Sequence, residues 1–146
     1  MPTTTRSRIV SATPEEVWAV VADPHHFPRW WPRVQRMEGV AAEFWTKVLK
    51  TDKGRSVRAD ELLLEDEPPR LRSWMQDLYE SPFERVFREI TTEVTLEPAG
   101  AGTNVTLALD QRLRGLNRLG GFLARRAAAR LLDEALEGLE LACGRR

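Results

Sequence analysis

The side chains that could do acid–base chemistry lie in the middle of the sequence, at Asp60, Glu61 and Arg88. Asp60 and Glu61 are neighbours in a strand-like segment, so one of them faces inward unless the strand twists away from the interior. A carboxyl group enclosed by apolar atoms has a raised pKa and can act as a general acid or base. The alternation does not decide which of the two is buried, and a solvated, paired carboxylate is the more common arrangement.

Arg88 is a candidate for holding an anionic group. It shares one side of its strand with Val86, Ile90 and Val94, provided that these three face the core. It would then bind an acidic part of a ligand or pair with a carboxylate. The alternative is a bulge that turns Arg88 to solvent, or a side chain that extends to the rim of the sheet. We favour this alternative because buried charges are rare unless they are paired.

Other familiar kinds of reactive site are missing from the sequence. It contains no glycine-rich phosphate loop, no serine nucleophile motif, no HExxH zinc motif and no paired cysteines. His25 and His26 are adjacent, and neighbours on a helical turn point about 100° apart, so they cannot easily share one metal ion. For Cys143 we favour a structural role over a nucleophilic one. We therefore assign no catalytic residue, no metal ligand and no cofactor.

Five tryptophans are many for 146 residues, and they could either fill the core or line a ligand pocket. Trp30 fits both roles equally well, whereas Trp18 is better placed to pack a helix against a sheet. Trp74 and Met75 are adjacent on a strand, so only one of them looks inward. The pattern leaves open which of the two it is.

The elements that must position these side chains begin with a strand at residues 4–11. Thr13 is suited to cap a helix that starts at Pro14, and Glu16 completes a capping box three residues after the cap. Asp23-Pro24 ends this helix. A second helical turn is expected at residues 25–31, closed by Pro32.

From Val34 onward, apolar residues recur with a period of two, which predicts β-strands. The predicted strands span residues 34–40, 44–51, 56–65, 71–77, 83–96 and 103–112. The turns at Asp52-Lys53-Gly54 and at residues 98–102 predict hairpins, and hence antiparallel pairing.

The last element is predicted to be a helix over residues 115–142, about 40 Å long at 1.5 Å per residue. Its apolar residues recur every three or four positions. They form one face with Leu116, Leu119, Leu123, Ala127, Leu131, Ala135, Leu139 and Ala142, widened by Phe122, Ala129, Leu132 and Leu136. Only this helix is long enough to cover the apolar face of seven antiparallel strands. A curved sheet does not close flush along such a helix, so we expect a cavity between them.

The charges of this helix run against its dipole, with basic residues in the first half and acidic residues in the second. Pairing with acids on the sheet would explain the basic half, and an anion or acidic partner near Arg125 and Arg126 is the alternative. We favour the first, because most charged faces are solvated or locally paired. Gly120-Gly121 either bends the helix or marks its start, and in both cases this segment could gate the cavity. Alternatively, the glycines only permit close approach of the helix to the sheet.

Length and composition indicate one domain over residues 1–146. Hydrophobic residues make up 42% and charged residues 30%, which is ordinary for a globular protein. The formal net charge is zero, so no overall field attracts nucleic acid or an anionic membrane. The sequence has one cysteine, no apolar signal segment and no run of 18 apolar residues, so we expect a soluble, cytoplasmic protein without stable membrane insertion. It does not indicate a protein partner.

Several short motifs follow one another in a distinctive order. They are Ala12-Thr13-Pro14-Glu15-Glu16-Val17-Trp18, Asp23-Pro24, Phe27-Pro28-Arg29-Trp30-Trp31-Pro32, Glu67-Pro68-Pro69-Arg70-Leu71, and Glu97-Pro98-Ala99-Gly100 with Gly102-Thr103. This series resembles the START/Bet v 1-like (SRPBCC) superfamily, specifically its bacterial polyketide cyclase/dehydrase and lipid-transport branch. The resemblance implies an α+β helix-grip fold: a seven-stranded curved antiparallel sheet around a long C-terminal helix, with two short helices after the first strand. It also implies a mostly apolar cavity for a lipid-like or polycyclic ligand, but no shared catalytic motif.

We expect the protein to carry or sense a small hydrophobic molecule in that cavity, without a cofactor. One alternative is an enzyme of the polyketide aromatase/cyclase type, which requires two or more polar side chains converging in the cavity. Another is a protein-partner-binding module, which requires a filled interior and an exposed apolar patch. A carrier requires a nearly apolar lining with one or two polar anchors. The residues expected to contact the ligand are Trp30, Trp74, Val86, Arg88, Ile90, Leu107, Leu109, Phe122, Leu123 and Arg126.

Overall fold

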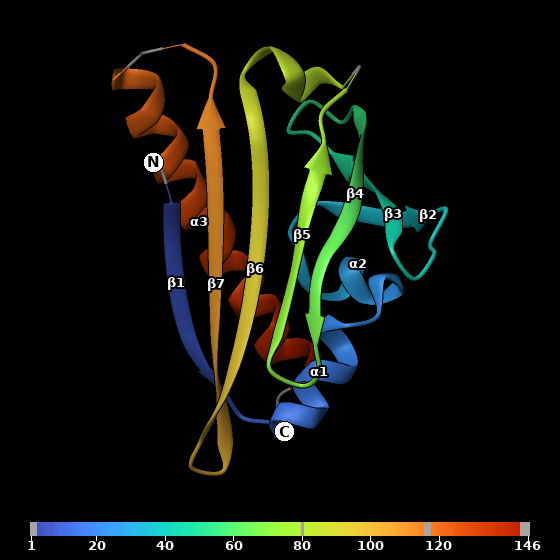
Figure 1. Cartoon of the computed structure of the whole chain (residues 1–146), viewed down its shortest axis with the longest axis vertical. Helices are drawn as coiled ribbons and strands as arrows, with labels where there is room; N and C mark the ends of the chain where they lie inside the picture. Colours follow the sequence, from blue (N-terminus) through green and yellow to red (C-terminus); the bar gives the residue numbers. More distant parts are fainter. Residues whose placement is uncertain (1–2, 80, 116–117, 144–146) are drawn as a thin grey trace.

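The computed structural model describes residues 3–79, 81–115 and 118–143. The elements follow the predicted order of a strand, two short helices, six strands and a long helix (Figure 1). β1 (Thr3–Val10) leads into α1 (Pro14–Val21), a 3₁₀ turn (Pro24–His26) and α2 (Phe27–Trp30). The later elements are β2 (Val34–Glu38), β3 (Phe44–Lys50), β4 (Ser56–Glu67), β5 (Leu71–Asp77), β6 (Phe87–Ala99), β7 (Gly102–Leu113) and α3 (Arg118–Cys143).

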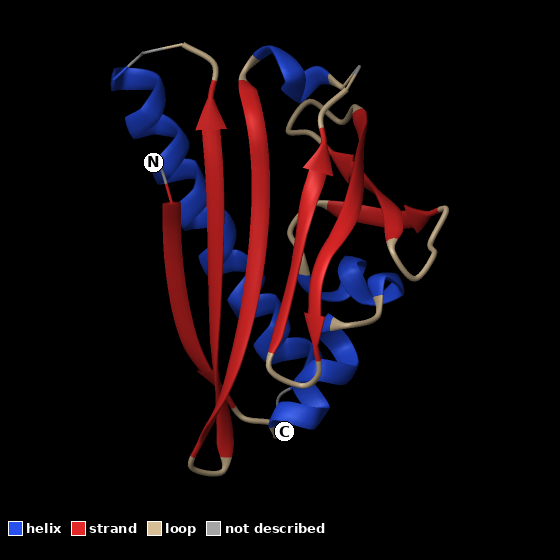
Figure 2. Cartoon of the chain, viewed as in Figure 1, coloured by secondary structure: helices blue, strands red, loops and turns tan. Residues whose placement is uncertain are grey.

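The seven strands form one antiparallel sheet in the order β1-β7-β6-β5-β4-β3-β2. β2 to β7 pair with their neighbours in sequence, and β1 pairs with β7. The hairpin loops contain Gly54 and Gly100, whose φ angles of 79° and 62° favour glycine. Figure 2 shows the strands in front of α3, with α1 and α2 at the end where α3 finishes. The predicted helix-grip fold is therefore confirmed.

The start of α1 forms the predicted capping box. The Thr13 hydroxyl accepts a hydrogen bond from the Glu16 backbone N–H at 3.2 Å, and the Glu16 carboxylate accepts one from the Thr13 N–H at 2.9 Å. Both bonds satisfy donors that a helix start leaves unpaired. They fix the entry of the chain into α1, which buries Val17, Val20 and Val21 against the core.

The buried stripe of α3 begins later than the sequence predicted. The buried residues of α3 are Ala128, Leu132, Ala135, Leu136 and Leu139. In contrast, Phe122, Leu123 and Ala127 are exposed, and the last two line an open groove along the first part of the helix. Leu116 and the side chain of Leu119 lie outside the described part of the structure.

The reversed charge pattern of α3 has a structural explanation in its acidic half only. Asp133 pairs with Arg6 at 3.5 Å and Glu140 pairs with Arg8 at 3.8 Å, so β1 supplies the opposite charges. Within residues 3–79, 81–115 and 118–143, no ion pair engages Arg126 or Arg130 of the basic half. The expected pairing of these arginines with acids on the sheet is therefore wrong.

The segment before β6 also differs from the prediction. Residues Pro82–Arg85 form a 3₁₀ turn, β6 starts at Phe87, and the register shifts between Phe87 and Glu89. As a result Val86 is 50% exposed and Arg88 is exposed, while the inward alternation starts only at Ile90. The predicted inward orientation of Val86 is therefore wrong. Arg88 is turned to solvent by the register shift, which is the alternative favoured from the sequence.

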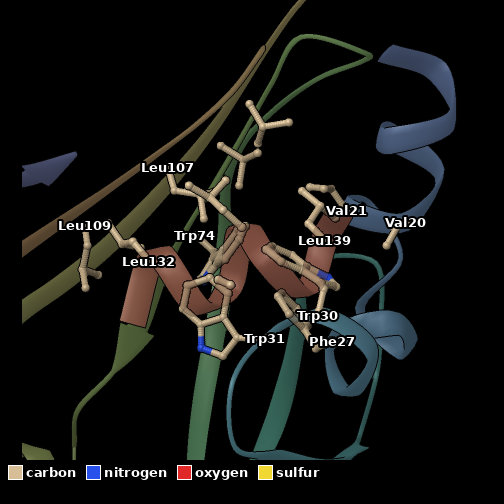
Figure 3. Packing of buried hydrophobic residues seen from close by; sticks show 14 of the residues in the cluster. Val20, Val21, Phe27, Trp30, Trp31, Trp74, Leu107, Leu109, Leu132 and Leu139 are labelled. Atoms are coloured by element: carbon tan, nitrogen blue, oxygen red, sulfur yellow. The ribbon is translucent and has the colours of Figure 1, made fainter. Parts of the chain in front are cut away.

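An aromatic cluster fills the interior between the sheet and the end of α3 (Figure 3). Its members, with ring centroids 5.4 to 6.3 Å apart, are Phe27, Trp30, Trp31, Trp45 and Trp74. α3 approaches α2 closely at Gly138, where an added Cβ would lie 2.5 Å from the Trp30 carbonyl oxygen. Among the described residues, no helix is long and apolar enough to span a membrane.

Candidate ligand-binding site

Beside the aromatic cluster, the space between the sheet and α3 contains a cavity of about 280 Å³. Its wall is formed by strands β3 to β7, by the segment that follows α2, and by α3. The apolar part of the wall includes Trp31, Leu49, Val57, Ile90, Leu109 and Leu131. The cavity occupies only part of the interior, because the aromatic cluster fills the region next to α2.

A buried ion pair between Lys47 and Glu61 forms part of the cavity wall. The Lys47 Nζ lies 3.1 Å from both carboxylate oxygens of Glu61. Trp45 Nε1 donates a further hydrogen bond to Glu61 Oε1 at 2.8 Å. β3 and β4 position these groups, because Trp45 and Glu61 are cross-strand partners and Lys47 follows two residues after Trp45 on the same face.

Lys47 is surrounded by aromatic rings as well as by its carboxylate partner. Its Nζ lies 4.0 Å from the ring centroid of Trp31 and 4.2 Å from that of Phe27. Burial lowers the pKa of the Lys47 amine from its usual value, and the Glu61 carboxylate offsets part of this shift. The ring faces favour the ammonium form, so the pair and its aromatic surroundings together hold a charge inside the core.

Two further buried polar side chains line the cavity. Gln76 on β5 lies opposite Glu61 and is 9% exposed, and its Nε2 has no hydrogen-bond acceptor among the described residues. Thr92 on β6 is also buried. Asp60 faces away from the cavity and accepts a hydrogen bond from the Thr46 hydroxyl at 2.6 Å. Of the two adjacent carboxylates that the sequence left open, Glu61 is therefore the inward one.

The cavity adjoins a groove of about 660 Å³ that is open to solvent along α3. Arg33, Gln111 and Leu131 line both spaces, so the groove forms the mouth of the cavity. Arg126 and Arg130 of α3 line the groove together with Glu134. Arg33 pairs with Asp52, which leaves the two arginines of α3 as the cations of the mouth without an ion-pair partner in the described chain.

The structure brings only some of the predicted ligand-contacting residues to this site. Ile90 and Leu109 line the cavity, and Leu123 and Arg126 line the groove. Trp30, Trp74 and Leu107 are buried in the core outside the lining of either space. Phe122 is 56% exposed and borders neither space, so its predicted inward orientation is wrong, as is that of Val86. Arg88, which was also expected to contact the ligand, is exposed and lines neither space.

Lys47 and Gln76 line the cavity, although neither was predicted from the sequence. A usable signal was present, since Trp45, Lys47 and Leu49 share one side of an alternating strand and two of the three are large and apolar. Likewise, once Trp74 is the inward residue of its pair, Gln76 must face the same way. Lysine and glutamine were passed over because both are usually exposed.

The remaining candidate groups form no reactive centre. His25 and His26 both lie next to Asp23, at 2.9 and 3.8 Å. A search of the described residues finds no group of three or more side chains placed to hold a metal ion. Burial, together with Glu140, raises the pKa of the Cys143 thiol to about 11, which disfavours the reactive thiolate.

Comparison with known families assigns the chain to a known group. The family model described as polyketide cyclase/dehydrase and lipid transport matches residues 1–144. The chain belongs to this family. The resemblance inferred from the sequence motifs is thereby confirmed. No curated protein matches the sequence.

Solved structures with the same fold show how widely this family's architecture is shared. A START superfamily protein from Mycobacterium smegmatis is 16% identical, with a TM-score of 0.80, covering 97% of this chain and 96% of that one. A Thermus thermophilus protein is 24% identical, with a TM-score of 0.73 and coverage of 95% and 94%. The di-domain ARO/CYC protein StfQ of the steffimycin biosynthetic pathway is 13% identical, with a TM-score of 0.79, covering 97% of this chain and 50% of that one. At these identities the likeness concerns the fold alone.

Proposed function

We propose that this family member binds a small hydrophobic molecule in the cavity between the sheet and α3, as a carrier or sensor. The observation that supports this most is the cavity itself. Its wall is largely apolar, and it lies where the sheet and the helix would otherwise pack together. A space of about 280 Å³ is near the lower end of ligand pockets, so the ligand is compact or extends into the groove.

The mouth favours a ligand with an acidic end. Arg126 and Arg130 line the groove without an ion-pair partner in the described structure, and Arg33 lies beside them. An arginine guanidinium binds carboxylates through two parallel hydrogen bonds. An amphipathic acid would therefore place its apolar body in the cavity and its carboxylate at the groove.

Isothermal titration with 2-naphthoate tests this proposal. We expect Val57→Phe, which adds an aromatic ring to the cavity wall, to weaken binding by about tenfold or more, equivalent to 1.4 kcal/mol per tenfold. Leu62→Phe is the matched control, because Leu62 lies on the same strand but is exposed. Replacing Arg126 and Arg130 with glutamine should weaken 2-naphthoate more than neutral 2-naphthol. If neither compound binds the wild-type protein, or if Val57→Phe has no effect on either, the proposal is wrong.

A second candidate is an enzyme of the aromatase/cyclase type, which the Lys47–Glu61 pair favours because two ionisable groups meet at the cavity wall. Against it, each member of the pair already has its partner, and Lys47 is further held by Trp31 and Phe27. The enzyme would be favoured if the wild-type protein converts a polyketide-like ketone and the Lys47→Met variant does not. The partner-binding alternative expected a filled interior, which the cavity does not provide. The cytoplasm remains the proposed location, since a lone cysteine cannot form an internal disulfide.

A further inference from the structure

We infer that Gln76 is the polar anchor in the wall of the cavity, and that the ligand carries a hydrogen-bond-accepting oxygen on the part that lies inside the cavity. This inference rests on the proposed function and adds the chemistry that selects the ligand. A ketone, an ester or an alcohol would satisfy it, whereas a pure hydrocarbon would not.

The geometry around Gln76 leaves its amide nitrogen without a hydrogen-bond acceptor among the described residues. Gln76 lies directly opposite Glu61, the nearest strong acceptor on the neighbouring strand. Glu61 already receives one hydrogen bond from Trp45 at 2.8 Å and one from Lys47 at 3.1 Å. The Gln76 Nε2 makes no hydrogen bond to Glu61 or to any other residue that the structure describes.

Gln76 also differs from the other buried polar atoms without partners. These are His26 Nδ1, Trp30 Nε1 and Trp74 Nε1, and none of the three residues lines the cavity. Gln76 does line it, on the same side of β5 as the inward Trp74. Of the buried polar atoms without a partner in the described residues, the Gln76 Nε2 is therefore the one whose side chain borders the cavity, and a rotation of this side-chain amide would present the N–H to a molecule there.

An unpaired buried amide costs free energy, because an enclosed donor without an acceptor loses its hydrogen bonds to water. An apolar residue would pack better at this position. A ligand oxygen would restore the missing hydrogen bond, and the hydroxyl of Thr92 nearby on the wall could add a second one. Sites with buried polar groups discriminate strongly against ligands that cannot pair with them.

A matched pair of probes tests this inference. 2-Acetonaphthone carries a carbonyl oxygen, and 2-isopropylnaphthalene has nearly the same shape without it. Dissociation constants are measured by competition with a bound fluorescent naphthalene dye, and the ratio between the two probes is compared across variants. This comparison cancels the different solubilities of the probes. We expect Gln76→Leu to reduce the preference for the ketone by about tenfold, as expected for one lost hydrogen bond.

Gln35→Leu is the control, because Gln35 on β2 is exposed and lines neither the cavity nor the groove. It should leave the ratio unchanged. Gln76→Met provides a second variant of similar length, and binding of 2-isopropylnaphthalene verifies that each variant is folded with its cavity intact. If the ratio is the same in wild type, Gln76→Leu and Gln76→Met while both probes bind, the inference about Gln76 is wrong and the proposed function stands. If neither probe binds the wild type, the proposed function itself fails.

Discussion

At the scale of single residues, the unusual feature is a charge pair enclosed in an aromatic core. Lys47 is 2% exposed, and its ammonium group lies between Glu61 and the faces of Trp31 and Phe27. Such a pair adds little net stability over an apolar pair of the same shape. Removing one partner, however, leaves the other charge buried without a partner. The pair therefore acts as a constraint on how β3 and β4 pack against α2.

This arrangement predicts a strong asymmetry between single and double substitutions. Lys47→Met should lower the free energy of unfolding by about 3–5 kcal/mol, because Glu61 is left buried with only Trp45 as a donor. Adding Glu61→Gln should restore most of the loss, since the double variant has no charge at either position of this pair. Urea unfolding of the wild type, both single variants and the double variant measures the coupling.

The exposed pair Arg112–Glu89, at 3.3 Å, serves as the comparison in a second double-mutant cycle. Its coupling should stay within about 1 kcal/mol, as for other solvent-exposed pairs. A Lys47–Glu61 coupling no larger than that of Arg112–Glu89 would show that Lys47 does not hold a charge in the core.

The residue level is also where sequence reasoning was weakest. Alternation could narrow the choice to Asp60 or Glu61, but only the register of β4 against β3 and β5 shows that Glu61 is inward. Lys47 and Gln76 lay on inward rows that the pattern could identify. They were missed because the preference of such residues for solvent outweighed the alternation.

At the scale of elements, the close approach of α3 to α2 depends on one glycine. A Cβ at position 138 would lie 2.5 Å from the Trp30 carbonyl oxygen and 3.0 Å from its Cα, and backbone atoms cannot move aside easily. Gly138→Ala should therefore destabilise the protein by about 1–3 kcal/mol, although alanine is the better helix former. Thermal or urea unfolding measures this change.

Gly121→Ala is the matched control within the same helix. An added Cβ there would meet Leu113 Cδ1 at 3.9 Å, which is an ordinary contact. We expect an increase in stability of up to about 1 kcal/mol from helix propensity alone. Equal and positive effects at both positions would contradict the close packing of α2 on α3.

Most elements could be predicted from the sequence because local signals and tertiary packing agree. The capping box fixed the start of α1, and β5 was predicted with the bounds that the structure shows. The prediction of a strand in the segment before β6 was wrong, because the apolar periodicity continues through Pro82–Arg85. The chain instead forms a 3₁₀ turn there, followed by a bulge at the start of β6. The apolar periodicity of α3 likewise continues past the point where the sheet stops covering it, so Phe122 and Leu123 were wrongly expected to be buried.

At the scale of the whole molecule, the sheet and α3 leave a gap that the aromatic cluster fills only in part. The sequence could predict that such a gap exists, because one long helix cannot close flush against a curved seven-stranded sheet. It could not predict how much of the gap five large aromatic side chains would occupy, since this depends on their rotamers and mutual packing. The remaining cavity, its apolar wall and its cationic mouth together carry the functional proposal.

The most direct test is native mass spectrometry of the protein purified from its own host, for the wild type, Val57→Phe and Leu62→Phe. The account predicts a bound small molecule that is present in the wild type and in Leu62→Phe, is released on unfolding, and is absent from Val57→Phe. A bound molecule retained equally by all three proteins would place it outside the cavity. The unliganded mass alone in all three would contradict the claim that this cavity holds a hydrophobic ligand.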